Sequence, residues 1–153
     1  MIAVDRTSLL VEVDATLPLG QCEDALRADG LTLGVAPRDR GATVGDWLAR
    51  GADGAPDPWS DPADHLVAGI EATLKDGRRL SIRPAPRRAV GPDLIALLVG
   101  TRGRFATIER AWLRVHHASG ERARVHPLAF DRDPPLGEDE SRLLDAIERE
   151  LST

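Results

Sequence analysis

The sequence predicts an α+β fold in which an antiparallel sheet is flanked by helices. Three observations support this prediction: segments in which apolar and polar residues alternate, a strong hairpin signal between two of them, and segments with apolar residues at helical spacing. The chain has 153 residues, of which 42% are hydrophobic and 3% aromatic. This length suits one compact domain, whose core must consist mainly of Leu, Val, Ile and Ala.

The first part of the chain alternates between strand and helix signals. Residues 9–13 predict a strand that begins almost at the N-terminus. A helix follows, which Pro18 opens and Gly30 ends, and residues 31–33 form a short extended segment. The apolar residues of this helix, at helical spacing, are Leu19, Cys22 and Leu26.

A second, short helix is predicted where Thr43 caps a segment that runs through Leu48. Residues 51–62 form a loop, because they hold several Gly and Pro residues and no periodic pattern. Residues 65–75 predict the next strand.

The strongest turn signal of the sequence is Asp76-Gly77. It predicts a two-residue hairpin turn, because both central positions of such a turn favour residues that accept a positive φ. The returning strand covers residues 78–83, with Leu80 and Ile82 on one face.

The following segment combines a helix, a turn and a long strand. Asp93 is predicted to cap a short helix that runs through Val99. Gly100 and Gly103 bracket a tight turn, and residues 105–116 predict a long strand.

The C-terminal part predicts a last strand over residues 125–130, which completes a domain of residues 1–130. Residues 131–153 form a linker and an amphipathic helix from Glu138 to Leu151. The apolar stripe of this helix consists of Leu143, Leu144, Ile147 and Leu151. Such a stripe is expected to dock on the sheet of its own chain or on a second copy.

Charge is distributed unevenly along the chain. Residues 1–74 carry 5 basic and 13 acidic side chains, residues 75–125 carry 12 and 4, and residues 126–153 carry 3 and 8. A basic middle between acidic ends suits an anionic ligand, a binding partner or neutralisation within the fold, and we expect neutralisation. The basic residues have no interleaved aromatics, so no nucleic-acid binding is expected.

The reactive residue types form no recognisable catalytic or metal motif. The histidines at positions 65, 116, 117 and 126 lack metal-ligand spacing with Cys, Asp or Glu, so no metal site is expected. Cys22 is the only cysteine, which is consistent with a cytoplasmic protein. We expect no signal peptide and no membrane span, because no apolar segment has the required length.

Six segments occur in the order and spacing of a known family. Over residues 42–49 the chain reads ATVGDWLA, similar to the family pattern aTvGG.iA, and over residues 97–103 it reads LLVGTRG, similar to LlvGs.G. The other segments cover residues 9–18, 26–37, 64–78 and 108–115. Over about residues 4–117 the chain therefore resembles the FAD-linked oxidases with a PCMH-type FAD-binding domain, the family of the glycolate oxidase subunits.

The resemblance implies an FAD site shared between two α+β subdomains. It covers the second subdomain only, and the Gly-rich loop that holds the pyrophosphate belongs to the first. If FAD is bound together with a partner chain, the resemblance implies that these residues contact it: Thr43, Val44, Gly45, Gly54, Gly100, Thr101, Gly103 and Ile108.

Departures from the family pattern suggest that the chain alone holds no cofactor. Asp46 replaces the second Gly of the Gly-Gly pair, and a carboxylate there would repel a pyrophosphate. Arg104 and Phe105 stand in the family's GtlG turn, and Arg110 replaces a Glu. We therefore expect a truncated relative of these flavoproteins, a pseudoenzyme that acts as a non-catalytic binding or assembly module. The alternative is an FAD-binding component completed by a partner that carries the Gly-rich half.

The expected contact surface is the flavin-facing one, which comprises Gly45, Asp46, residues 51–59 and residues 100–105. A protein partner or a two-fold homodimer is expected to cover it. Trp47, Trp59 and Phe105 are its expected anchors. In a homodimer, Arg102 and Arg104 would meet the acidic N-terminal segment of the second copy.

Overall fold

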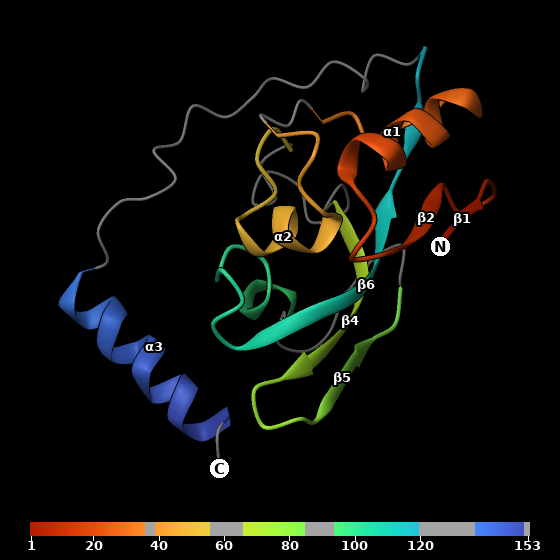
Figure 1. The fold of residues 1–153 in the computed structure, drawn as a ribbon. Helices are drawn as coiled ribbons and strands as arrows, with labels where there is room; N and C mark the ends of the chain where they lie inside the picture. The colour runs from red at the N-terminus through yellow and green to blue at the C-terminus, as the bar shows by residue number, and fades with distance from the viewer. Residues whose placement is uncertain (36–38, 56–65, 85–93, 120–136, 152–153) are drawn as a thin grey trace.

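The structure is a computed structural model, and it describes residues 1–35, 39–55, 66–84, 94–119 and 137–151. Its centre is a sheet of five strands in the order β1-β2-β6-β4-β5, in which every neighbouring pair is antiparallel. The strands are β1 (Ile2–Asp5), β2 (Leu10–Asp14), β4 (Val67–Leu74), β5 (Arg79–Ile82) and β6 (Ala106–Arg114). This sheet and its helices confirm the predicted α+β class (Figure 1).

Two short strands form a second, smaller pair beside this sheet. They are β3 (Leu31–Thr32) and β7 (His116–His117), which are also antiparallel. The predicted strand over residues 105–116 is thus divided between β6 and β7. His116 is half-buried and His117 is exposed, as the alternation of side chains along a strand requires.

The first strand of the sheet was not predicted. β1 pairs with β2 in a register that places Ile2 opposite Val13 and Val4 opposite Val11. Ile2 and Val4 are half-buried, and both pack against the core. The segment is only four residues long, so its alternation is too short to stand out in the sequence.

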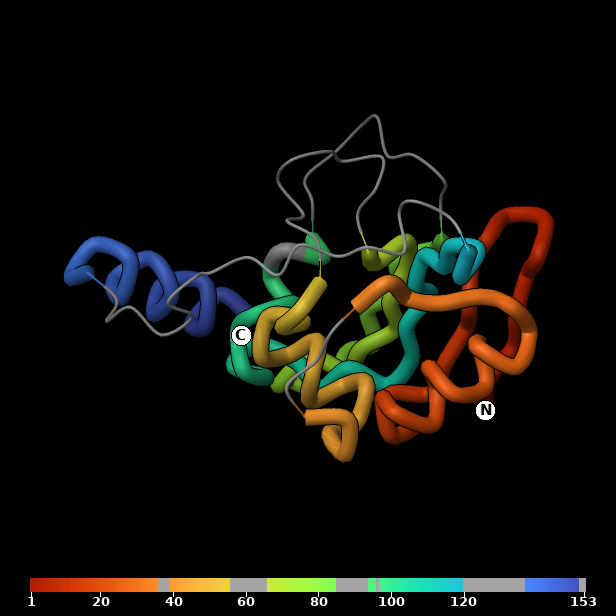
Figure 2. Tube along the Cα trace, turned by 90° about the horizontal axis from the view of Figure 1, so that it is seen from above, coloured from red at the N-terminus to blue at the C-terminus, as the bar shows by residue number. Residues whose placement is uncertain are grey.

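In the described part of the chain, the helical segments beside the strands are α1 (Leu19–Ala28), α2 (Val44–Ala49), the 3₁₀ helix η2 (Leu94–Leu97) and α3 (Glu138–Leu151). α1 and α2 lie on the same side of the sheet, where α2 packs against β2 and β6 (Figures 1 and 2). α1 buries the three predicted core residues, and α2 begins after Thr43, as predicted. The predicted Asp93 cap, the strand over residues 125–130 and the linker over residues 131–136 lie outside the described residues.

The hairpin between β4 and β5 differs in detail from the predicted two-residue turn. Thr73 pairs with Arg79, and the N–H of Leu74 donates to the carbonyl of Arg78 at 2.8 Å, which leaves a loop of three residues. Only Gly77 has a positive φ, of 86°, whereas Asp76 does not. The Asp76 carboxylate accepts the N–H of Arg78 at 2.8 Å, and this local bond favours the longer loop.

The core lies between the sheet and the helices on one side. Along β6, Ala106, Ile108, Ala111 and Leu113 are buried, whereas the intervening Thr107 and Glu109 are exposed. One face of the sheet therefore carries the hydrophobic core, and the other face carries polar side chains.

α3 stands apart from this core. It projects from the body of the protein in both views (Figures 1 and 2), and none of its residues is buried. Leu143, in the predicted apolar stripe, is 62% exposed. The other stripe residues, Leu144, Ile147 and Leu151, are half-buried. The stripe is therefore covered only in part, and its docking on the sheet of its own chain or on a second copy stays a prediction.

Candidate functional site

The N-terminus of α2 contains three of the residues predicted to contact a cofactor. The hydroxyl oxygen of Thr43 accepts the N–H of Asp46 at 3.1 Å, which is the predicted helix cap. Val44 donates its N–H to the carbonyl of Leu17 at 2.9 Å, and Gly45 donates to the carbonyl of Ala15 at 2.8 Å. These bonds hold the start of α2 against the chain that follows β2.

The close contact between Gly45 and Ala15 explains why position 45 is a glycine. A Cβ atom at Gly45 would lie 2.9 Å from the Cβ of Ala15 and 3.2 Å from its carbonyl oxygen. A Cβ atom with a neighbour at 2.9 Å is essentially never found in proteins, so any larger residue forces the backbone apart. Packing alone thus accounts for this glycine without any ligand.

A pyrophosphate does not fit the N-terminus of α2. Binding such a group requires several backbone N–H donors that point at it, and the first N–H groups of this helix already donate to Leu17, Ala15 and Thr43. The exposed carboxylate of Asp46 lies in the same first turn, where it interacts favourably with the helix dipole and repels an anion.

The opposite end of α2 is closed by the turn that Gly100 and Gly103 bracket. The N–H of Gly100 donates to the carbonyl of Leu48 at 3.0 Å, and the N–H of Arg102 donates to the carbonyl of Ala49 at 2.7 Å. Gly100 and Gly103 have φ values of 82° and 72°, which confirms the predicted tight turn. The turn therefore supplies donors for the last carbonyl groups of α2.

The other residues that were predicted to contact a cofactor bond or pack within the chain. The hydroxyl of Thr101 lies 3.2 Å from the carbonyl oxygens of both Leu97 and Leu98, to which it can donate. Ile108 is buried in β6 opposite Ala72 of β4. Gly54 is buried in the segment that follows α2, with a φ of 75°.

The structure brings these residues together only in part. Thr43, Val44 and Gly45 lie at one end of α2, and Gly100 and Thr101 lie at the other, across a helix about 9 Å long. Backbone bonds from each group hold α2 in place, whereas the Thr101 hydroxyl contacts Leu97 and Leu98.

The expected aromatic anchors belong to the core. Trp47 and Phe105 are each 1% exposed. The indole N–H of Trp47 donates to the carbonyl of Asp53 at 2.9 Å, which satisfies its polar atom within the chain. The expectation that these two residues line an open interface is therefore wrong, and Trp59 lies outside the described residues.

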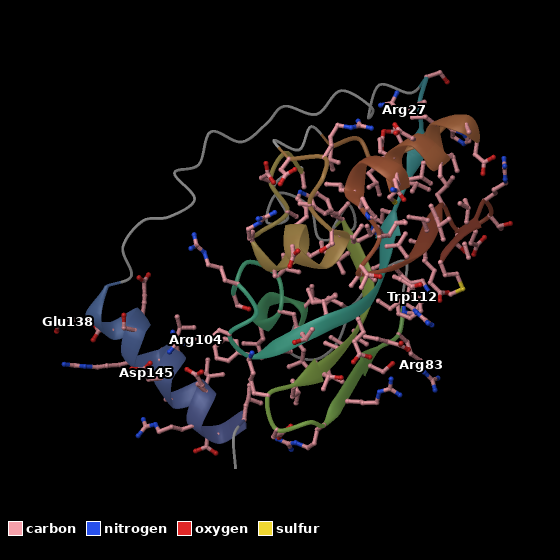
Figure 3. All side chains as sticks on the ribbon, in the orientation of Figure 1. Arg27, Arg83, Arg104, Trp112, Glu138 and Asp145 are labelled. Atoms are coloured by element: carbon pink, nitrogen blue, oxygen red, sulfur yellow. The ribbon has the colours of Figure 1, made fainter. Side chains whose placement is uncertain are left out.

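Arg104 connects the turn before β6 to α3 (Figure 3). Its Nη2 lies 2.5 Å from the Oδ1 of Asp145, and its Nε lies 2.9 Å from the Oε2 of Glu148. The hydrogen bond to Glu148, together with the one to Asp145, raises the pKa of Arg104. Its guanidinium also lies 5.9 Å from the ring centre of Phe105. Within the chain, the acidic partners of Arg104 thus lie on α3.

Other ion pairs join the basic middle of the chain to its acidic residues. Arg110 lies 3.1 Å from Glu12 and 3.6 Å from Asp14, on the polar face of the sheet. Arg79 lies 3.3 Å from Glu109. Together with the ion pairs of Arg104, these contacts indicate that basic and acidic side chains neutralise each other within the fold, as expected from the uneven charge.

A buried polar cluster near α1 was missed by the sequence analysis. The Glu23 carboxylate is 6% exposed, and it accepts hydrogen bonds from the Thr32 hydroxyl at 2.5 Å and from the Leu33 N–H at 3.0 Å. Arg27 adds a bond of 2.8 Å from its Nε. The i,i+4 spacing of Glu23 and Arg27 was a visible signal, whereas the approach of Thr32 was not.

The described residues hold no metal-binding cluster and no reactive thiol. No three of their His, Cys, Asp and Glu side chains are grouped as a metal site. Burial raises the pKa of the Cys22 thiol to about 12, so it stays protonated at neutral pH. Within the described ranges, no helix is long and apolar enough to span a membrane.

Comparisons with known proteins show that the chain is similar to part of two curated proteins, an FAD-linked oxidoreductase and a D-lactate dehydrogenase. No family model matches the chain. It is 29% identical over 116 residues to an uncharacterized FAD-linked oxidoreductase, YgcU, of Escherichia coli (strain K12), and 30% identical over 115 residues to a D-lactate dehydrogenase of Archaeoglobus fulgidus. These matches cover 75% and 74% of this chain, but only 24% and 26% of the two relatives.

The fold also has counterparts among solved structures. Two crystal forms of alkyldihydroxyacetonephosphate synthase superpose with TM-scores of 0.62 and 0.61, at 24% sequence identity. They cover 76% and 75% of this chain and 21% of the synthase. The chain thus spans about a quarter of the length of the curated relatives that it matches, and the fold of the matching part is shared.

Proposed function

We propose that this chain, which is related to the FAD-linked oxidases with a PCMH-type FAD-binding domain, acts as a non-catalytic binding or assembly module and binds no flavin by itself. One observation carries the proposal: the backbone donors at both ends of α2, where the resemblance places cofactor contacts, are engaged within the chain. A cofactor phosphate would have to displace these internal hydrogen bonds, and the Asp46 carboxylate would oppose it.

A protein partner is the proposed ligand of this module. The turn of residues 100–105 and the first turn of α2 are the surfaces through which it would bind. The anchors cannot be Trp47 and Phe105, which are buried, so polar groups such as Arg104 and Asp46 would dominate the contact. Polar contacts of this kind give specificity and a salt-dependent association rate.

The visible absorption spectrum of the purified full chain tests the proposal. We expect a colourless preparation that releases no FAD on denaturation. A yellow preparation with the absorption band of a flavin, and FAD in the supernatant after denaturation, would overturn it.

A second candidate function follows from the relatives. YgcU is described as FAD-linked, and the chain matches about a quarter of it, so this chain could supply one part of an FAD site. In this reading a partner chain contributes the Gly-rich half that holds the pyrophosphate, and the eight residues from Thr43 to Ile108 named above contact FAD at the joint. Purification of the tagged chain from its native host distinguishes the two readings. A complex that contains stoichiometric FAD supports the shared site, and a flavin-free complex supports the module.

A further inference from the structure

The contact between Arg104 and α3 joins two parts of the chain that are far apart in sequence. Asp145 and Glu148 lie three residues apart on α3, so both carboxylates lie on one side of the helix and reach the same guanidinium. Figure 3 shows Arg104 at the base of its turn, directed toward α3. The Arg104 side chain is only 29% exposed, because the helix covers it in part.

Among the described residues, these ion pairs link α3 to the body of the protein. No residue of the helix is buried, and Leu143 at its outer edge is 62% exposed. Leu144, Ile147 and Leu151 are half-buried, so the helix is packed only in part. A 14-residue helix with so little packing is only marginally stable in water. The side chains of Asp145 and Glu148 are 64% and 44% exposed, so solvent and salt weaken both ion pairs. The helix is therefore held weakly, by these ion pairs and by the partial burial of its apolar residues.

We propose that Arg104 and α3 form a latch, in which α3 occupies the surface around Arg104 and excludes an acidic helical segment of a protein partner from it. The charge of the helix supports this occupant, since residues 138–151 carry six carboxylates and two arginines. The proposed function places partner binding at the turn of residues 100–105. The part of this inference that concerns a partner therefore rests on the proposed function. The latch itself does not depend on that function.

Hydrogen exchange of the α3 amides in the full chain tests the latch. Glu148→Lys removes one ion pair and repels Arg104, so we expect the amides of residues 141–151 to exchange about tenfold faster. Glu150→Lys is the matched control, because it makes the same charge change on an exposed residue two positions away, and we expect a change of less than about twofold. In the triple variant Arg104→Glu with Asp145→Lys and Glu148→Lys, both ion pairs are reversed, and slow exchange is expected to be restored.

Two outcomes would overturn the latch. One is equal exchange in the Glu148→Lys and Glu150→Lys variants, which would mean that helix propensity or net charge sets the rate. The other is fast exchange in the charge-reversed triple variant. In the wild-type chain, 1 M NaCl reduces the screening length to about 3 Å and is expected to open the latch.

A labelled peptide of residues 137–151 tests whether the surface beneath α3 accepts an acidic helix from another molecule. Fluorescence anisotropy should show binding to the Glu148→Lys chain, whose own helix is released, at least about tenfold tighter than to the wild-type chain. Binding should be lost in the Arg104→Glu chain. No binding to the Glu148→Lys chain would refute the surface. A chain that proved to bind FAD would refute the proposed function and leave these exchange results unchanged.

Discussion

The backbone N–H of Gly100 donates a 3.0 Å hydrogen bond to the carbonyl oxygen of Leu48, the second-last residue of α2. The turn that the family resemblance places beside a cofactor therefore has a structural use in this chain. At the other end of α2, Gly45 donates to Ala15 in the same way. α2 is a short helix whose two ends are both closed by neighbouring backbone.

Replacement of Trp47 tests whether it is a core residue or an interface anchor. Because Trp47 is fully enclosed and its N–H bonds to Asp53, Trp47→Ala should lower the free energy of unfolding by about 3–5 kcal/mol. The control Trp112→Ala, at a half-exposed position of β6, should cost roughly 1 kcal/mol. Urea denaturation measures both. A Trp47→Ala chain of normal stability that loses self-association would show that Trp47 is an interface residue instead.

Substitution of Gly45 tests whether the close packing of α2 against Ala15, rather than a ligand, requires a glycine at this position. Gly45→Ala places a Cβ atom 2.9 Å from that of Ala15, so we expect a loss of about 1–3 kcal/mol in the free energy of unfolding. Ala15→Gly in the same chain removes the nearer of the two contacts and should recover part of the loss. If the two substitutions are additive in urea denaturation, the Cβ contact is not the cause.

The Glu23 cluster predicts a stability effect at a position that the sequence analysis did not identify. Glu23→Gln replaces one acceptor oxygen with an NH₂ group, so one of the donors that converge on the carboxylate loses its partner. We expect a cost of about 1–3 kcal/mol. Asp24→Asn, at the adjacent exposed position paired with Arg40, should cost less than about 1 kcal/mol. Equal midpoints in urea denaturation for the two variants would contradict a structural role of Glu23.

Local patterns in the sequence were sufficient for most of the fold. α1 followed from apolar residues at helical spacing, α2 from the Thr43 cap, and β5 from its alternation after Gly77. The hairpin loop was predicted one residue too short, because the side-chain bond from Asp76 to the N–H of Arg78 competes with the two-residue turn. The side-chain bond is local, but which of the two loop lengths forms depends on the register in which the two strands pair.

The site was less predictable, because it depends on contacts between distant residues. The sequence indicated that Trp47 and Phe105 were aromatic and near the site, but burial is decided by the elements that pack around them. The partner of Arg104 lies 41 residues away at Asp145, on a helix whose orientation no local pattern specifies. The resemblance to a flavoprotein family named positions at both ends of α2, and the hydrogen bonds of the structure show that backbone donors there are engaged within the chain.

Titration of FAD into the purified full chain tests the central claim most directly. Two features are proposed to oppose FAD binding: the Asp46 carboxylate and the engagement of the backbone donors of α2. Calorimetry with the wild-type chain and with Asp46→Gly separates them, since the variant removes the carboxylate and keeps the internal hydrogen bonds of α2. We predict no saturable binding to either chain at concentrations near 100 µM, on the order of a weak ligand's Kd. Saturable one-to-one binding of FAD to the wild-type chain would contradict the account, and binding to Asp46→Gly alone would show that the carboxylate, not the engaged donors, excludes the cofactor.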